Sequence, residues 1–121
     1  MQKSIIIVEN DIEVRDGIKF VLEDTFESEV VAKLTTEENI NESYELKHPY
    51  LTLISMDPDN QEEISYAREF INTHPDALTV ALSSTTDQVY HKFVREVGFK
   101  GFINKNNFLQ DFKSTLNIFN S

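Results

Sequence analysis

The side chains with the clearest capacity for chemistry in this sequence are polar residues that directly follow short apolar runs. They are Glu9, Asn10, Asp11, Ser55, Ser83 and Lys105. Carboxylate, amide and hydroxyl oxygens are the ligands that a hard cation such as Mg²⁺ prefers, and a lysine adds a positive charge. Each residue alone is also consistent with a simpler role, because Asp11 can cap a helix and Glu9 can be solvated. Their joint chemistry depends on whether the fold brings them together.

Apolar runs alternate with segments of helical period along the whole chain. Runs of mostly β-branched or apolar residues predict strands at residues 4–8, 29–33, 51–55, 78–83 and 101–104. Helical spacing of apolar residues predicts helices that include residues 14–22, 37–47, 64–71, 89–97 and 109–119. Asp11 is placed as the N-cap of the first helix, Thr36 precedes the second, and Gly98 stops the fourth.

This strict alternation predicts the fold class. We expect an α/β domain with a three-layer, doubly wound sheet of five parallel strands, joined by right-handed crossovers. The sequence has no linker-like or low-complexity segment, so we expect one domain over residues 1–121. In such sheets the functional crevice lies beyond the carboxyl ends of the strands. The polar residues above are therefore predicted to gather at one edge of the sheet.

Composition and charge exclude several classes of function. The chain has 121 residues, 21 acidic and 11 basic, and a formal net charge of −10, which disfavours direct binding to nucleic acid or anionic lipid. It has no cysteine, which excludes disulfides, Cys-ligated zinc and thiol catalysis. No apolar stretch is long enough for a membrane span, and the N-terminus does not resemble a secretory signal, so we expect a cytoplasmic protein.

Four segments carry a further pattern, namely residues 5–11, 48–55, 82–84 and 101–105. In order and spacing they resemble the receiver domain of bacterial two-component response regulators, over essentially the whole chain. The likeness is greatest to receivers that precede a LuxR-type helix-turn-helix domain, and such a DNA-binding domain would lie outside these residues. The resemblance implies a flavodoxin-like sheet with strand order 2-1-3-4-5.

The resemblance also implies roles for individual residues. Ser83 matches the switch hydroxyl that contacts a phosphoryl group, Phe102 matches the switch aromatic that moves with it, and Lys105 matches the lysine of the site. Glu9 and Asn10 match the acidic pair that holds Mg²⁺ in the family, and Ser55 stands at the position of the phosphoacceptor aspartate.

Three of these matches depart from the family pattern in chemistry. With Glu9, Asn10 and Ser55, the formal charge at the three positions is −1 instead of −3. These residues remain the candidate metal ligands, but we expect weak Mg²⁺ binding or none, and no other cofactor. A serine hydroxyl is not ionised near neutral pH, so Ser55 is a poor phosphoacceptor. We expect Lys105 to form a fixed ion pair with Glu9 instead.

These observations favour a pseudo-receiver, a non-enzymatic interaction module that lacks the phosphoacceptor aspartate. The expected partners are proteins, either a histidine kinase or a regulator output domain, and a homodimer is also compatible with the pattern. We expect no direct contact with nucleic acid or membrane.

Two other functions remain open. The first is a phosphotransfer-competent receiver in which Asp57 serves as the substitute carboxylate, with Mg²⁺. A shift of two residues past a strand end moves a side chain by about 6 Å, which disfavours this alternative. The second is a small-ligand-binding doubly wound domain. It is disfavoured because the chain has only three glycines and no phosphate-binding loop.

Overall fold

The structure, a computed structural model, describes residues 3–85 and 87–120. Strands and helices alternate in the order β1 (Ser4–Val8), α1 (Ile12–Asp24), β2 (Glu29–Leu34), α2 (Ile40–Lys47), β3 (Leu51–Ser55), α3 (Gln61–Thr73), β4 (Thr79–Ser83), α4 (Gln88–Val97), β5 (Gly101–Asn104), the short 3-10 helix η1 (Lys105–Asn107) and α5 (Phe108–Phe119). The predicted alternation is confirmed. No helix of the described part is long and apolar enough to cross a membrane.

The five strands form one parallel sheet in the order β2-β1-β3-β4-β5, as expected. The chain runs from β1 to the edge strand β2, and then crosses back past β1 to β3 on its other side. The strand order therefore reverses between β1 and β3, which is the position where doubly wound sheets form their crevice. We predicted one domain over residues 1–121. Residues 1, 2, 86 and 121 of that range lie outside the part of the chain that the structure describes.

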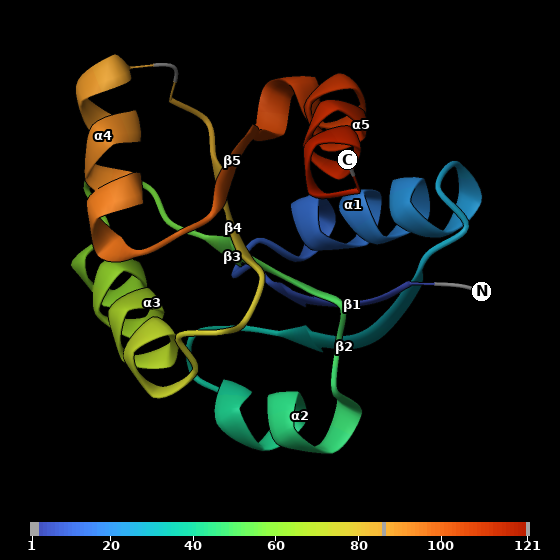
Figure 1. Ribbon diagram of the computed structural model, residues 1–121, viewed down its shortest axis with the longest axis horizontal. Helices are drawn as coiled ribbons and strands as arrows, with labels where there is room; N and C mark the ends of the chain where they lie inside the picture. The colour runs from blue at the N-terminus through green and yellow to red at the C-terminus, as the bar shows by residue number, and fades with distance from the viewer. Residues whose placement is uncertain (1–2, 86, 121) are drawn as a thin grey trace.

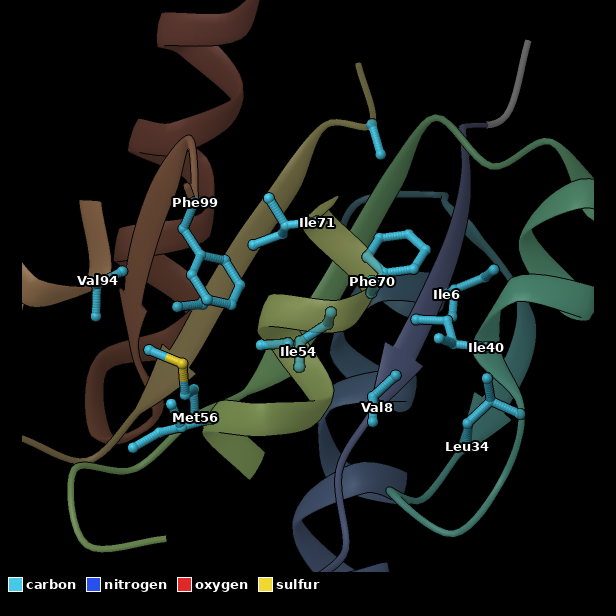
Figure 2. Close-up of a cluster of buried hydrophobic side chains, with 14 of the residues drawn as sticks. Ile6, Val8, Leu34, Ile40, Ile54, Met56, Phe70, Ile71, Val94 and Phe99 are labelled. Carbon is cyan, nitrogen blue, oxygen red and sulfur yellow. The ribbon is translucent and has the colours of Figure 1, made fainter. Parts of the chain in front are cut away.

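Helices cover both faces of the sheet in three layers (Figure 1). Helices α1 and α5 lie on one face, and α2, α3 and α4 lie on the other. Alternate residues of β1 supply the two cores: Ile5 and Ile7 pack with the α1 and α5 side, whereas Ile6 and Val8 pack with the other. Figure 2 shows Ile6 and Val8 among the side chains of that second core. This alternation follows from the two-residue period of a strand.

Strands β3 and β4 are buried along their whole length, and this burial extends to the polar residue that ends each of them. Ser55 is 1% exposed and Ser83 is 0% exposed. Both strands lie between two others in the sheet, so side chains on both of their faces are covered. The sequence thus places two buried hydroxyls at the carboxyl edge of the sheet.

Capping residues set the helix ends. The side chain of Asp11 accepts hydrogen bonds from the amides of Glu13 and Val14, as predicted for an N-cap. Gly98 ends α4 with φ of 119°, and a Cβ at this position would lie 2.7 Å from Cγ2 of Ile71 in α3. Glycine is therefore required at Gly98 both by backbone conformation and by the close approach of α3.

The predicted start of α2 is wrong by about one turn. The helix begins at Ile40, and its N-cap is Asn39, whose side chain accepts a hydrogen bond from the amide of Asn41. Thr36 does not begin the helix because its own groups bind elsewhere: its amide donates to Oδ1 of Asn10 and its hydroxyl to Oε1 of Glu62.

Candidate functional site

Lys105 is the centre of the polar site at the carboxyl edge of the sheet. It follows β5, and its Nζ lies 2.7 Å from Oε1 of Glu9, which follows β1. The same Nζ donates a 2.7 Å hydrogen bond to Oγ of Ser55, at the end of β3. The side chains of Lys105 and Glu9 are only 12% and 4% exposed, so this pair is largely shielded from water. The expected ion pair between Lys105 and Glu9 is present.

The main chain holds Glu9 in position. Its amide donates to the carbonyl of Leu34 at the end of β2, which continues the sheet by one residue. Its second carboxylate oxygen, Oε2, accepts a hydrogen bond of 3.1 Å from the amide of Asp11. A buried carboxylate is costly unless its oxygens have partners, and here one oxygen has an ammonium and the other an amide.

Asp57 also reaches the site, against the sequence expectation that a shift of two residues would take it away. Its Oδ1 accepts a hydrogen bond of 2.9 Å from the hydroxyl of Ser83, and a longer one of 3.4 Å from the amide of Ser84. Its Oδ2 lies 3.5 Å from Nζ of Lys105. The prediction extended the strand direction beyond Ser55, whereas the chain enters a turn at Asp57, in which the amide of Asn60 donates to the carbonyl of Asp57.

Glu63 fixes this turn, and the sequence reasoning missed it. The amide of Asp57 donates a 3.0 Å hydrogen bond to Oε1 of Glu63, in the first turn of α3. The amide of Glu63 in turn donates to Oδ1 of Asn60, the N-cap of α3, and the amide of Asn60 donates to the carbonyl of Asp57. An Asn followed three residues later by Glu is close to the capping-box pattern and could have identified the pair.

Burial and charge shift the proton affinity of two neighbouring groups. Burial raises the pKa of the Glu63 carboxyl above its ordinary value; the amide of Asp57 lowers it in part, and the charge of Asp57 raises it. Burial also raises the pKa of the Tyr90 phenol, and the negative charge of Asp57 raises it further, while a contact to Ser83 lowers it. The charge of Asp57 thus raises the pKa of one group in α3, Glu63, and of one group in α4, Tyr90.

The side chains of Asn10 and Asp11 do not join the site. The amide group of Asn10 bonds Thr36, with Oδ1 accepting from the Thr36 amide at 2.9 Å and Nδ2 donating to its hydroxyl at 3.1 Å. Asp11 caps α1. Of the candidate metal ligands Glu9, Asn10 and Ser55, the structure brings together only Glu9 and Ser55.

The donor set does not fit a Mg²⁺ ion as arranged. Oε1 of Glu9 and Oγ of Ser55 both lie 2.7 Å from the ammonium of Lys105, which therefore holds the cation position between them. Hard cations need several free oxygen ligands. Within residues 3–85 and 87–120, no three histidine or carboxylate side chains are arranged to hold a metal.

Phe102 lies in β5 and is half-buried on the α4 side of the sheet. Its ring centroid is 4.0 Å from that of His91 and 6.3 Å from that of Tyr90, both in α4. Burial raises the pKa of the Tyr90 phenol, and the negative charge of Asp57 adds to this effect. Aromatic packing therefore connects the site to α4 and β5.

Comparison with known structures identifies the fold. A LuxR-family two-component response regulator from Aurantimonas sp. is 16% identical over 98% of this chain and 85% of its own, with a TM-score of 0.77. A LuxR-family DNA-binding response regulator from Staphylococcus aureus is 14% identical over 98% and 99%, with a TM-score of 0.76. A CheY-like receiver domain protein from Methanospirillum hungatei is 21% identical over 98% and 96%, with a TM-score of 0.72.

No protein-family model and no curated protein matches the sequence. The structural likeness nevertheless extends over nearly the whole chain and agrees with the observed strand order. The fold of this chain is that of response-regulator receiver domains.

Proposed function

We propose that this protein is a receiver-like signalling domain that does not accept a phosphoryl group and acts through contacts with other proteins. The observation that carries the proposal is the 2.7 Å hydrogen bond from Lys105 to Ser55. Where the family resemblance implies an ionised carboxylate at the end of β3, this chain has a buried, neutral hydroxyl beside a lysine.

The surroundings of Ser55 disfavour nucleophilic attack by its hydroxyl. A serine needs a neighbouring base to take its proton. Its near neighbour Lys105 is an ammonium paired with the carboxylate of Glu9 at 2.7 Å, and an ammonium has no lone pair to accept a proton. Ser55 is also 1% exposed, which restricts the approach of a phosphodonor.

A second candidate function is phosphotransfer to Asp57, which is favoured by its position in the site. Its two oxygens are, however, directed at the Ser83 hydroxyl and at Lys105. A phosphoryl group on Asp57 would need these same donors for its own charge. The arrangement also leaves Asp57 without a neighbouring set of free metal ligands, because Glu9 and Ser55 bind Lys105.

Under this proposal the domain catalyses no reaction and is cytoplasmic. Its partners are a histidine kinase, an output domain or a second copy of the chain. A DNA-binding response regulator is among the similar structures, which is consistent with a role beside an output domain.

The test is incubation with Mg²⁺ and acetyl phosphate, followed by intact-mass measurement. We expect no phosphoryl adduct on the wild-type protein. The matched variant is Ser55→Asp, which supplies the missing carboxylate at the same place; an adduct on this variant would assign the loss to Ser55. An adduct on the wild-type protein that disappears in Asp57→Asn would overturn the proposal in favour of phosphotransfer to Asp57.

A further inference from the structure

We propose that the Ser83 hydroxyl, the Ser84 amide and the Lys105 ammonium form a binding site for a small oxyanion, and that the Asp57 carboxylate fills this site as an internal ligand. The occupant is a side chain of the same protein, so the site is filled without phosphorylation and excludes free anions. This inference rests on the proposed function, because it explains what takes the place of a transferred phosphoryl group.

The geometry of Asp57 is that of a bound anion. One oxygen, Oδ1, accepts from the Ser83 hydroxyl at 2.9 Å and from the Ser84 amide at 3.4 Å. The other, Oδ2, lies 3.5 Å from the ammonium of Lys105. A hydroxyl, a main-chain amide and an ammonium that converge on one carboxylate are typical of oxyanion recognition.

The donors come from elements that are fixed independently of Asp57. Ser83 is fully buried at the end of β4, and Lys105 is held by Glu9 and Ser55. Asp57 itself lies in a turn, and its side chain is 39% exposed. Removing the Asp57 carboxylate should therefore leave the donors in place and open to solvent.

The site is coupled to the start of α4. The hydroxyl of Ser83 donates to Asp57 and also accepts a 3.3 Å hydrogen bond from the amide of Thr85, in the connection from β4 to α4. Asp57 thereby orients the Ser83 hydroxyl, the same group that accepts from the Thr85 amide.

Chemical rescue tests the proposal. The Asp57→Ala protein is titrated with sodium formate and, separately, with inorganic phosphate at constant ionic strength, and its melting temperature is followed. We expect Asp57→Ala to melt below the wild type, and each anion to raise its melting temperature saturably, with at least about tenfold tighter binding than to the wild type. Formate and phosphate distinguish a carboxylate-sized site from one that also takes a phosphate.

Two variants control for charge and for volume. Asp59→Ala removes an exposed carboxylate from the same turn and should show no rescue. Asp57→Asn removes the charge but leaves the site filled by an amide, and should also show none. In Asp57→Ala/Ser83→Ala, which lacks a donor, the rescue should weaken. If Asp57→Ala does not fold, Asp57→Ser titrated with phosphate and followed by ³¹P NMR gives the same information.

The proposal is overturned if the anions raise the melting temperature of Asp57→Ala no more than that of the wild type and Asp59→Ala. This outcome is distinct from failure of the proposed function, which would appear as a phosphoryl adduct on the wild-type protein. If the wild-type protein gains no adduct and Asp57→Ala shows no rescue, the proposed function stands and the proposal that Asp57 is an internal anion is rejected.

Discussion

The hydroxyl of Ser83 donates a 2.9 Å hydrogen bond to Oδ1 of Asp57, a residue 26 positions earlier in the chain. Together with the Lys105 ammonium between Glu9 and Ser55, this contact means that the protein's own side chains supply both a cation and an anion at the carboxyl edge of the sheet. Lys105 thus faces two carboxylates, those of Glu9 and Asp57, and the site carries its own cation and its own anions.

The buried pair of Lys105 and Glu9 should contribute strongly to stability once formed. Lys105→Met leaves the carboxylate of Glu9 buried without its cation, and we expect a loss of about 3 kcal/mol in the free energy of unfolding, measured by urea denaturation. Lys33→Met breaks an exposed pair with Asp16, 3.5 Å apart, and should cost less than about 1 kcal/mol.

The double variant Glu9→Gln/Lys105→Met removes both charges and should recover much of the loss of Lys105→Met, because an unpaired buried charge costs more than a neutral pair. Equal losses for Lys105→Met and Lys33→Met would contradict the assignment of Lys105 as a shielded ion-pair partner.

Much of this architecture could be predicted from the sequence, but the loop at the site could not. The alternation of Ile5, Ile6, Ile7 and Val8 between two cores is a local consequence of strand geometry, so the sheet could be predicted from apolar periodicity. The ion pair of Glu9 with Lys105 could be predicted from the resemblance to receiver domains, which places both residues in one site; strand order alone does not imply it, because β3 and β4 lie between β1 and β5.

The place of Asp57 depends on a hydrogen bond between its amide and Glu63, which apolar periodicity does not encode. The prediction of where α2 starts was wrong for the same kind of reason. Thr36 is a good N-cap by residue type, but its contacts with Asn10 and Glu62 come from other elements, and Asn39 caps the helix instead.

Glu63 should make stability depend on pH. Its pKa is raised in the folded protein, so between the unfolded and folded pKa values the native state binds more protons than the unfolded state. The free energy of unfolding then falls as pH rises through the folded pKa. Glu63→Gln keeps an oxygen to accept from Asp57 and removes this dependence.

We therefore expect the melting temperature of Glu63→Gln, relative to the wild type, to be more favourable at pH 7 than at pH 4. The control is Glu62→Gln, an exposed neighbour in the same helix turn. A difference between Glu63→Gln and the wild type that does not change with pH would argue against a raised pKa at Glu63.

Replacing two of the glycines by alanine should change the stability of the protein in opposite directions. Gly98→Ala must adopt φ of 119° with a Cβ 2.7 Å from Ile71, and we expect a loss of about 2 kcal/mol. Gly17 lies within α1, and a Cβ added there would meet nothing within 4 Å, so Gly17→Ala should stabilise the protein by roughly 0.5 to 1 kcal/mol. Chemical denaturation of both variants measures the two effects, and a stable Gly98→Ala protein would show that α3 and α4 do not approach so closely.

If Lys105 and Asp57 already supply the cation and the anion of the site, neither Mg²⁺ nor a phosphoryl analogue should find a place there. The decisive measurement is the melting temperature of the wild-type protein in Mg²⁺ with and without beryllofluoride, a phosphoryl analogue. We expect no saturable rise with Mg²⁺, and none with Mg²⁺ and beryllofluoride together. A saturable rise that requires both components, and that is lost in Asp57→Asn, would contradict the internal supply of both charges.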